Sequence, residues 1–219
     1  MHHPSSTLTP AQDFVADQAS NAQLLAALLS DWPGSTRAVR QSERLLGPGQ
    51  SLLGLLRQPQ MSRCGRLDSL SKVQRRLRVA IELVLRSMHE DLAERCLLSS
   101  PVQVRHFLRL WLRDQARECF VGLFLDAQHR LIQAEVLFQG SLNQTAVYPR
   151  EVARRALELN AAALIVAHNH PSGVTEPSAA DRLLTDSLKT TLRMLDIPVL
   201  DHLIVGDRQC FSFAEAGLI

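Results

Sequence analysis

The stretch AHNHPSGVTEPSAAD, from Ala167 to Asp181, decides how the rest of the chain is interpreted. His168 and His170 follow the apolar run AAALIVA, which is typical of a buried strand. Alternate residues of an extended segment point to the same side, so the two imidazoles can face one metal ion. Asp181 comes after ten further residues, in the expected first turn of the next helix, where a folded-back loop can bring it to the same metal.

Two histidines and one carboxylate form the ligand set of a catalytic zinc ion, because they leave one tetrahedral position open for water. Zinc would lower the pKa of that water to about 7 and supply a nucleophile at neutral pH. Each part also has a plainer interpretation: Ser178 and Asp181 fit a helix capping box, and single histidines are more often surface or core residues. The complete spacing favours the metal site, and Ser178 can serve in both roles.

The sequence around this stretch alternates between expected strands and helices, which predicts an α/β domain. The expected strands cover residues 118–126, 130–138, 161–168, 199–205 and 210–213. The expected helices cover residues 101–114, 149–160 and 178–195.

The N-terminal half is expected to be helical. Ser35 should open a short helix that Gly47 can close, and a long helix should run from about Ser71 to Met88. The expected organisation is a flexible N-terminus over 1–19, a helical region over 20–90, a linker over 91–99 and the α/β domain over 100–219.

Length and composition are those of an ordinary globular protein, with 219 residues, 46% hydrophobic and 21% charged, and a net charge of +2. No apolar run approaches the roughly 20 residues of a membrane helix, and the N-terminus lacks a signal-peptide pattern. The four cysteines form no C-x-x-C pair, which indicates reduced thiols. We therefore expect a soluble cytoplasmic protein without membrane contact.

The residues from His168 to Asp181 resemble the JAMM (MPN-plus) metallopeptidase signature, an upstream glutamate followed by H-x-H-P-x6-S-x-x-D. More narrowly, HNHPSG followed by PS and Asp181 resembles the RadC family, as do SSPVQVRHFLRLWLRD, YPREVARRAL, LDHLIVG and FSFAEAGLI. The resemblance implies a JAMM/MPN-like, cytidine-deaminase-like three-layer domain at the C-terminus, with a smaller all-α region before it.

The resemblance also implies roles for residues that match the signature. The zinc ligands would be His168, His170 and Asp181. Glu118 would take a proton from zinc-bound water and deliver it to the leaving amine, and Ser178 would donate a hydrogen bond to the oxyanion.

Several of these assignments have rivals within the sequence. By spacing alone Glu118 would mark a solvated strand end, and Glu135 in the next strand competes for the acidic role. Asn169 and Ser172 are expected to shape the loop. We interpret His202 as a core histidine, or one that supports a ligand, but not as a ligand itself.

The first functional hypothesis is a zinc-dependent hydrolase of amide bonds, peptide or isopeptide, acting on an unidentified protein or peptide. The adjacent letters HNH do not indicate an HNH nuclease, whose residues are scattered through a ββα unit. A purely scaffolding role is disfavoured, because non-catalytic relatives typically lack the complete ligand set. The sequence leaves the oligomeric state open.

The second hypothesis is a DNA-associated protein, since the RadC family is traditionally labelled a DNA-repair family. Arg75, Arg76 and Arg78 lie on a basic helix that could contact phosphates. Family members carry a helix-hairpin-helix-like region with a G-x-G turn, whereas this chain has Ser69 and Ser71 at the glycine positions. Serine restricts both the left-handed geometry and the close approach of a phosphate, which weakens this hypothesis.

Overall fold

The computed structural model describes residues 19–29, 35–47, 67–112, 115, 117–140, 147–207 and 209–219, with backbone only for 67–71. The chain forms two compact units, Met1–Glu82 and Leu83–Ile219, and the boundary falls inside helix α4 (Leu67–Glu94). The flexible terminus expected over 1–19 lies outside the described residues up to position 18, and the side chains of Ser69 and Ser71 lie outside them as well.

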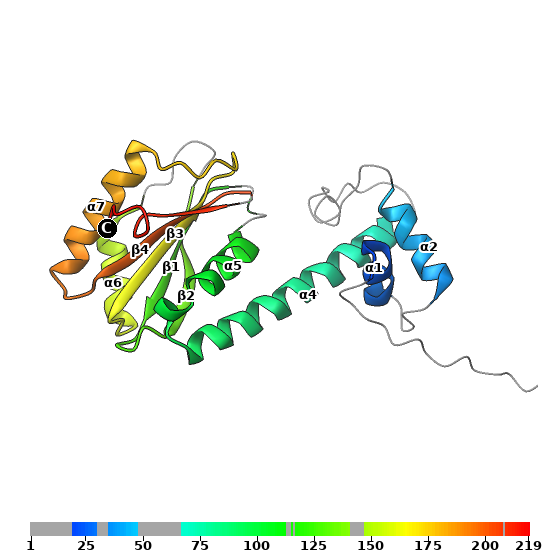
Figure 1. The fold of residues 1–219 in the computed structure, drawn as a ribbon, viewed down its shortest axis with the longest axis horizontal. Helices are drawn as coiled ribbons and strands as arrows, with labels where there is room; N and C mark the ends of the chain where they lie inside the picture. Colours follow the sequence, from blue (N-terminus) through cyan, green and yellow to red (C-terminus); the bar gives the residue numbers. More distant parts are fainter. Residues whose placement is uncertain are drawn as a thin grey trace, which may run out of the picture. The chain divides into compact units, whose positions relative to one another are not determined.

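The second unit is built on a five-stranded sheet in the order β2-β1-β3-β4-β5 (Figure 1). Strands β3 and β4 are parallel, and all other neighbours are antiparallel. The strands are β1 (Cys119–Leu125), β2 (Leu131–Gln139), β3 (Ala163–Asn169), β4 (Val199–Val205) and β5 (Cys210–Ser212). All five expected strands form, and β4 has the expected bounds.

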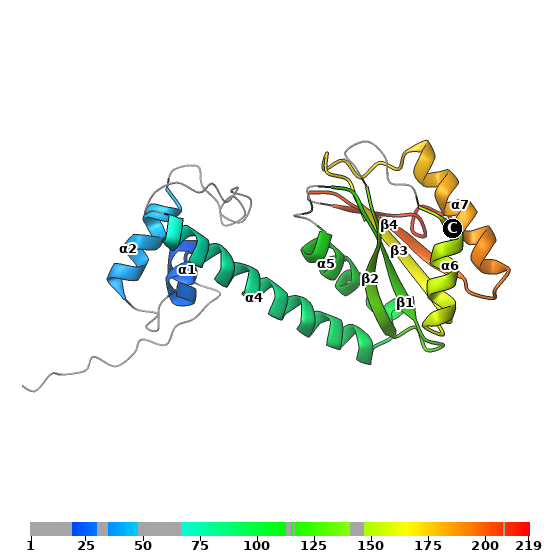
Figure 2. The same cartoon turned by 180° about the vertical axis from the view of Figure 1, so that it is seen from behind.

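Helices cover both faces of the sheet and make three layers, as expected. Helices α6 (Pro149–Glu158) and α7 (Ala179–Arg193) lie on one face, and α5 (Pro101–Leu112) lies on the other (Figures 1 and 2). Phe120 and Phe124 of β1 are buried on the α6 and α7 side, whereas Val121 and Leu123 are buried on the α5 side. Because both faces are covered, the central strands are apolar on both sides rather than alternating.

The segment between α4 and α5 differs from the expected linker over 91–99. Helix α4 continues to Glu94, and residues Leu97–Ser99 form the short 3-10 helix η2. The reason is packing: Leu92 and Leu97 are both buried in the same core as α5. Burying two leucines stabilises an ordered connection by a few kcal/mol, which a polar linker would not provide.

The first unit contains α1 (Asn21–Leu29), α2 (Thr36–Leu45) and the start of α4. Ser35 caps α2 as expected, with its hydroxyl accepting a hydrogen bond from the Ala38 N–H at 3.3 Å. Leu25 and Val73 form a small buried core. Among the described residues, no helix combines the length and apolarity needed to cross a membrane.

Candidate metal centre

The central strand β3 carries the first histidine into the interior. His168 is the penultimate residue of β3, is paired with Phe120 of β1 and Ile204 of β4, and is only 1% exposed. His170 follows the strand, and its N–H donates to the Val205 carbonyl at 3.0 Å. Pairing on both sides therefore fixes the backbone that presents the two imidazoles.

Two glycines shape the loop that follows. Gly173 has a φ of 80°, a left-handed conformation that favours glycine, and its N–H donates to the His170 carbonyl at 2.9 Å. Gly206, after β4, comes so close to this loop that a Cβ would lie 2.4 Å from the Gly173 carbonyl oxygen. The resulting turn places the Val174 carbonyl 2.7 Å from Nδ1 of His170.

Helix α7 supplies the carboxylate through its first turn. Ser178 is the N-cap: its hydroxyl accepts from the Asp181 N–H at 3.1 Å and donates to Asp181 Oδ2 at 2.6 Å. The Ser178 N–H also donates to Oδ2, at 2.7 Å. The capping box is therefore present, and Oδ1 of Asp181, which takes no part in it, is directed toward His168.

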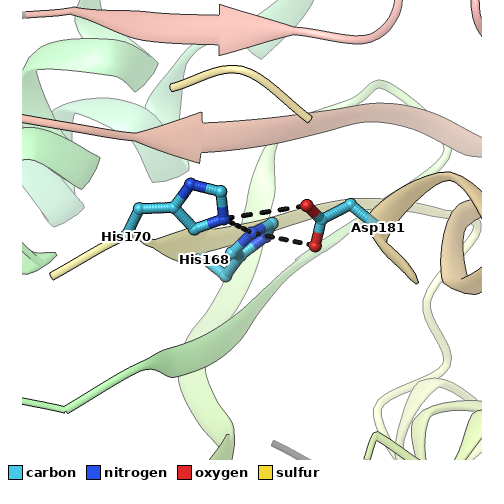
Figure 3. A group of neighbouring side chains, drawn as sticks. All are labelled: His168, His170 and Asp181. Carbon is cyan, nitrogen blue, oxygen red and sulfur yellow. Dashed lines mark hydrogen bonds and ion pairs between the residues drawn. The ribbon is translucent and has the colours of Figure 1, made fainter. Parts of the chain in front are cut away.

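The three side chains converge on one point (Figure 3). Nε2 of His168 lies 3.0 Å from Nε2 of His170 and 3.2 Å from Oδ1 of Asp181. Nε2 of His170 lies 3.7 Å from Oδ2 of Asp181. In a tetrahedral site with bonds of 2.0–2.1 Å the ligand atoms are about 3.3 Å apart, so the group could hold a metal ion.

The protonation of His170 supports this fit. A backbone carbonyl can only accept, so the contact with Val174 requires the proton of a neutral imidazole to sit on Nδ1. The lone pair of Nε2 then faces His168 and Asp181, with no hydrogen directed into the space that they share. Such a set of acceptors is stabilised by a cation.

The charges of the group are strongly coupled. Burial acts to raise the pKa of Asp181, but the neighbouring imidazoles of His168 and His170 and the hydrogen bonds from Ser178 outweigh it and hold that pKa well below its ordinary value. The nearby carboxylate of Asp181 raises the pKa of His170, against burial, and the charge of Glu118 adds to the rise. Asp181 is thus an ionised carboxylate, the form that binds metal.

Glu118 lies directly before β1 and is half-buried. Its carbonyl accepts from the Gly140 N–H at 2.9 Å, which extends the pairing of β1 with β2 by one residue. Phe120 is paired with His168, and side chains alternate along a strand, so Glu118 faces the side that carries the histidines. It is not one of the three residues whose ligand atoms meet.

Glu135, the alternative candidate for the acidic role, forms an ion pair with an arginine of helix α6. Its carboxylate accepts hydrogen bonds from Nε and Nη2 of Arg155 on α6, at 2.6 and 3.0 Å. Glu135 is paired with Gly122, four residues further along β1 than Glu118. This bidentate ion pair favours Glu118 for the acidic role, which stays a prediction.

Of the two residues expected to shape the loop, one acts differently. Asn169 does not shape the loop after it: its Oδ1 accepts from the Cys119 N–H at 2.8 Å and its Nδ2 donates to the Arg117 carbonyl at 3.1 Å. The backbone on both sides of Glu118 is thereby tied to β3. Ser172 does contact the loop, where its hydroxyl accepts from the Val174 N–H at 3.4 Å.

Sequence reasoning missed Thr185, one turn after Asp181 on α7. It is buried, its hydroxyl lies 2.6 Å from the Asp181 carbonyl, and it contacts Nδ1 of His202 at 2.7 Å. A polar residue on the same helical face as the buried Leu188 and Leu192 was the available signal. His202 is fully buried, and burial together with the charge of His168 lowers its pKa to about 3.

The residues of the second hypothesis lie in the first unit. Arg75 and Arg78 are exposed on α4. Arg76 is exposed too, but its Nη1 donates to the Leu28 carbonyl at 3.0 Å. Two of the three arginines therefore have side chains that could reach a phosphate without breaking this contact.

Known proteins resemble this chain along most of its length. Residues 98–218 match the protein family described as RadC-like JAB domain. The chain is 49% identical over 201 residues to a UPF0758 protein of Leptothrix cholodnii, and the aligned region covers 91% of this chain and 90% of the relative. It is 45% identical over 202 residues to a UPF0758 protein of Photobacterium profundum, and this alignment covers 92% of this chain and 90% of the relative. The similarity therefore extends beyond the matched domain into the N-terminal helices.

Proposed function

The chain belongs to the family of RadC-like JAB-domain proteins, and we propose that it is a zinc-dependent hydrolase of amide bonds in a protein or peptide. The observation that carries the proposal is the convergence of Nε2 of His168, Nε2 of His170 and Oδ1 of Asp181. Two neutral imidazoles and one carboxylate suit zinc among the common divalent metals, and three protein ligands are typical of catalytic zinc.

Zinc held by these residues would act as a Lewis acid and make water acidic enough to attack a carbonyl near neutral pH. His168, His170 and Asp181 would hold the ion in a fixed position, because each side chain is itself held by a hydrogen bond to a group outside the ligand set.

Glu118 is the proposed general base and acid. Its carboxylate would accept the proton of the attacking water as the water oxygen bonds to the amide carbon. It would return that proton to the nitrogen as the C–N bond breaks, so that a carboxylic acid and an amine leave. Its position on the histidine side of the sheet and its half-buried state support this role.

Ser178 is proposed to stabilise the oxyanion of the transition state. Its hydroxyl proton is directed to Asp181 Oδ2, so it must turn away to reach a substrate oxygen. The hydroxyl oxygen still accepts from the Asp181 N–H, and the Ser178 N–H keeps its bond to Oδ2, so helix α7 stays capped while the hydroxyl proton turns.

Metal binding is the first test. We expect about one zinc ion per chain by elemental analysis of protein loaded with zinc and then desalted, and loss of that zinc in His168→Ala. Full zinc occupancy in His168→Ala, or none in the wild type, would contradict the proposed site.

Turnover is the second test, and the two glutamates give matched variants. Cell lysate proteins are incubated with zinc-loaded enzyme in 18O-labelled water, and new amines and labelled carboxylates are identified by mass spectrometry. We expect products with the wild type and with Glu135→Gln, but none with Glu118→Gln, which keeps its zinc. Products from Glu118→Gln at the wild-type rate would reject the role of Glu118; no products from the zinc-loaded wild type would reject hydrolysis.

A further inference from the structure

The ring of His168 has a second nitrogen, Nδ1, that is not directed at the ligand group. It lies 2.9 Å from Nε2 of His202 on the neighbouring strand β4. One of these nitrogens must carry the hydrogen and the other must accept it. The choice decides whether His168 can bind a metal, because a neutral ring that accepts at Nδ1 carries its proton on Nε2, toward the metal.

Thr185 decides which nitrogen carries the hydrogen. Its hydroxyl oxygen lies 2.6 Å from the backbone carbonyl of Asp181 and 2.7 Å from Nδ1 of His202. The carbonyl can only accept, so the single hydroxyl proton of Thr185 is given to Asp181. His202 must then donate from Nδ1 to the hydroxyl, which leaves a lone pair on its Nε2, and His168 must donate to that lone pair.

The ring of His202 is also held in place by its neighbours. It stacks on Phe213 with ring centroids 4.8 Å apart and meets Phe120 edge-on at 5.8 Å. Since His202 is fully buried among these rings, its two nitrogens depend on Thr185 and His168 for their hydrogen bonds.

We propose that Thr185 and His202 form a tautomer lock that makes His168 present an unprotonated Nε2 to the metal. Both are positioning residues that act through His168. The lock begins at the backbone of Asp181 and ends at the ring of His168, so it couples two ligands through α7, β4 and β3. It rests on the metal site of the proposed function and is independent of hydrolysis.

The test is zinc affinity, measured by competition with a chelating dye on the full-length protein. Thr185→Val keeps the shape but removes the hydroxyl, so His202 can turn to the other tautomer. We expect its zinc affinity to fall about 10- to 100-fold, as is usual when a partner behind a metal-binding histidine is lost. Thr185→Ser restores the hydroxyl and should bind zinc nearly as the wild type does.

Thr190→Val is the matched control. Thr190 lies on the same helix, and its hydroxyl makes the same kind of bond, to the Asp186 carbonyl at 2.8 Å, but it is exposed. We expect no change in its zinc affinity. Equal affinities of Thr185→Val and wild type, or equal losses in Thr185→Ser and Thr185→Val, would overturn the lock.

A measurement on the wild type alone decides the case if Thr185→Val does not fold. Long-range 1H–15N NMR spectra identify the tautomer of each histidine, and we expect the proton on Nδ1 in both His168 and His202 of the zinc-loaded protein. A proton on Nε2 of His202 would overturn the lock. A wild type that binds no zinc would instead contradict the proposed function, so the two failures are distinguishable.

Discussion

The side-chain oxygen of Asn169 accepts a hydrogen bond from the backbone N–H of Cys119 at 2.8 Å, although the two residues are 50 positions apart. The amide nitrogen of Asn169 donates to the Arg117 carbonyl, so one side chain holds the backbone on both sides of Glu118. The residue between the two histidines of the ligand group thus connects them to the proposed catalytic glutamate.

Asn169→Ala should separate metal binding from turnover. Cys119 N–H is buried and would lose its acceptor, at a cost of about 1–3 kcal/mol in the free energy of unfolding. We expect zinc binding to persist, turnover to fall toward that of Glu118→Gln, and amide hydrogen exchange at Cys119 to accelerate. Asn169→Asp, which keeps the acceptor oxygen, should protect the Cys119 amide better than alanine does. Unchanged exchange in the alanine variant would argue against the connection.

Gly173→Ala should damage the metal site more than a similar change elsewhere. The left-handed backbone costs an alanine about 1–2 kcal/mol, and here the new Cβ would also lie 2.8 Å from Asp207 Oδ2. Displacing this turn moves the Val174 carbonyl away from His170, so zinc affinity should fall together with the melting temperature.

Gly217→Ala is the control for Gly173→Ala. Gly217 has a φ of 69°, but nothing lies within 4 Å of an added Cβ. Its cost should be limited to the backbone strain, with zinc affinity unchanged. Equal losses of zinc affinity in the two variants, measured by dye competition, would show that the turn at Gly173 has no specific role.

Asp201 should make stability fall as the pH rises above the ordinary range of a carboxyl group. Burial raises its pKa, although hydrogen bonds from Ser212, Ala214 and His202 oppose the rise. The folded chain therefore keeps this proton to a higher pH than the unfolded chain, where the pKa is about 3.9. The resulting stability is complete below the unfolded pKa and is lost as the pH rises through the folded one.

Asp201→Asn should remove this pH dependence, because an amide can keep the three contacts without a buried charge. From pH 4 upward, the free energy of unfolding of the variant, measured in urea, should therefore increase relative to that of the wild type. Asp126→Asn should behave in the opposite sense. The Arg130 backbone hydrogen bond, above all, lowers the pKa of Asp126, so its stabilisation is present above the unfolded pKa and is lost as pH falls. A flat difference for Asp201→Asn would contradict the assignment.

Binding of DNA by the first unit, if present, should depend on Arg75 and Arg78. Each phosphate contact contributes about 0.9 to the slope of log affinity against log salt, so replacing both by glutamine should reduce the slope by about 2. The control is Arg154→Gln on α6, an exposed arginine already paired with Glu151 and Glu158. Fluorescence anisotropy with a duplex of arbitrary sequence measures the slopes, and equal slopes for all three proteins would remove the DNA hypothesis.

The sequence alone was sufficient for the strands and for the candidate ligand set. Strands β1 and β3 are recognisable because continuous apolar runs bounded by polar residues report burial on both faces. His168, His170 and Asp181 could be proposed because their spacing follows from local structure: a strand end, a turn and the first turn of a helix. The end of α4 was harder to predict from the sequence, since Leu92 and Leu97 stabilise this segment only once the sheet is present to bury them.

Only the tertiary structure decided which groups surround these ligands. Glu135 is a rival to Glu118 in the sequence, and the ion pair between Glu135 and Arg155, 20 positions apart, separates the two only in the folded chain. The tautomer of His168 depends in the same way on His202 and Thr185, which come from another strand and from a helix. Local periodicity encodes the direction of a side chain relative to its own element, whereas a hydrogen-bond partner depends on which elements the sheet order brings together.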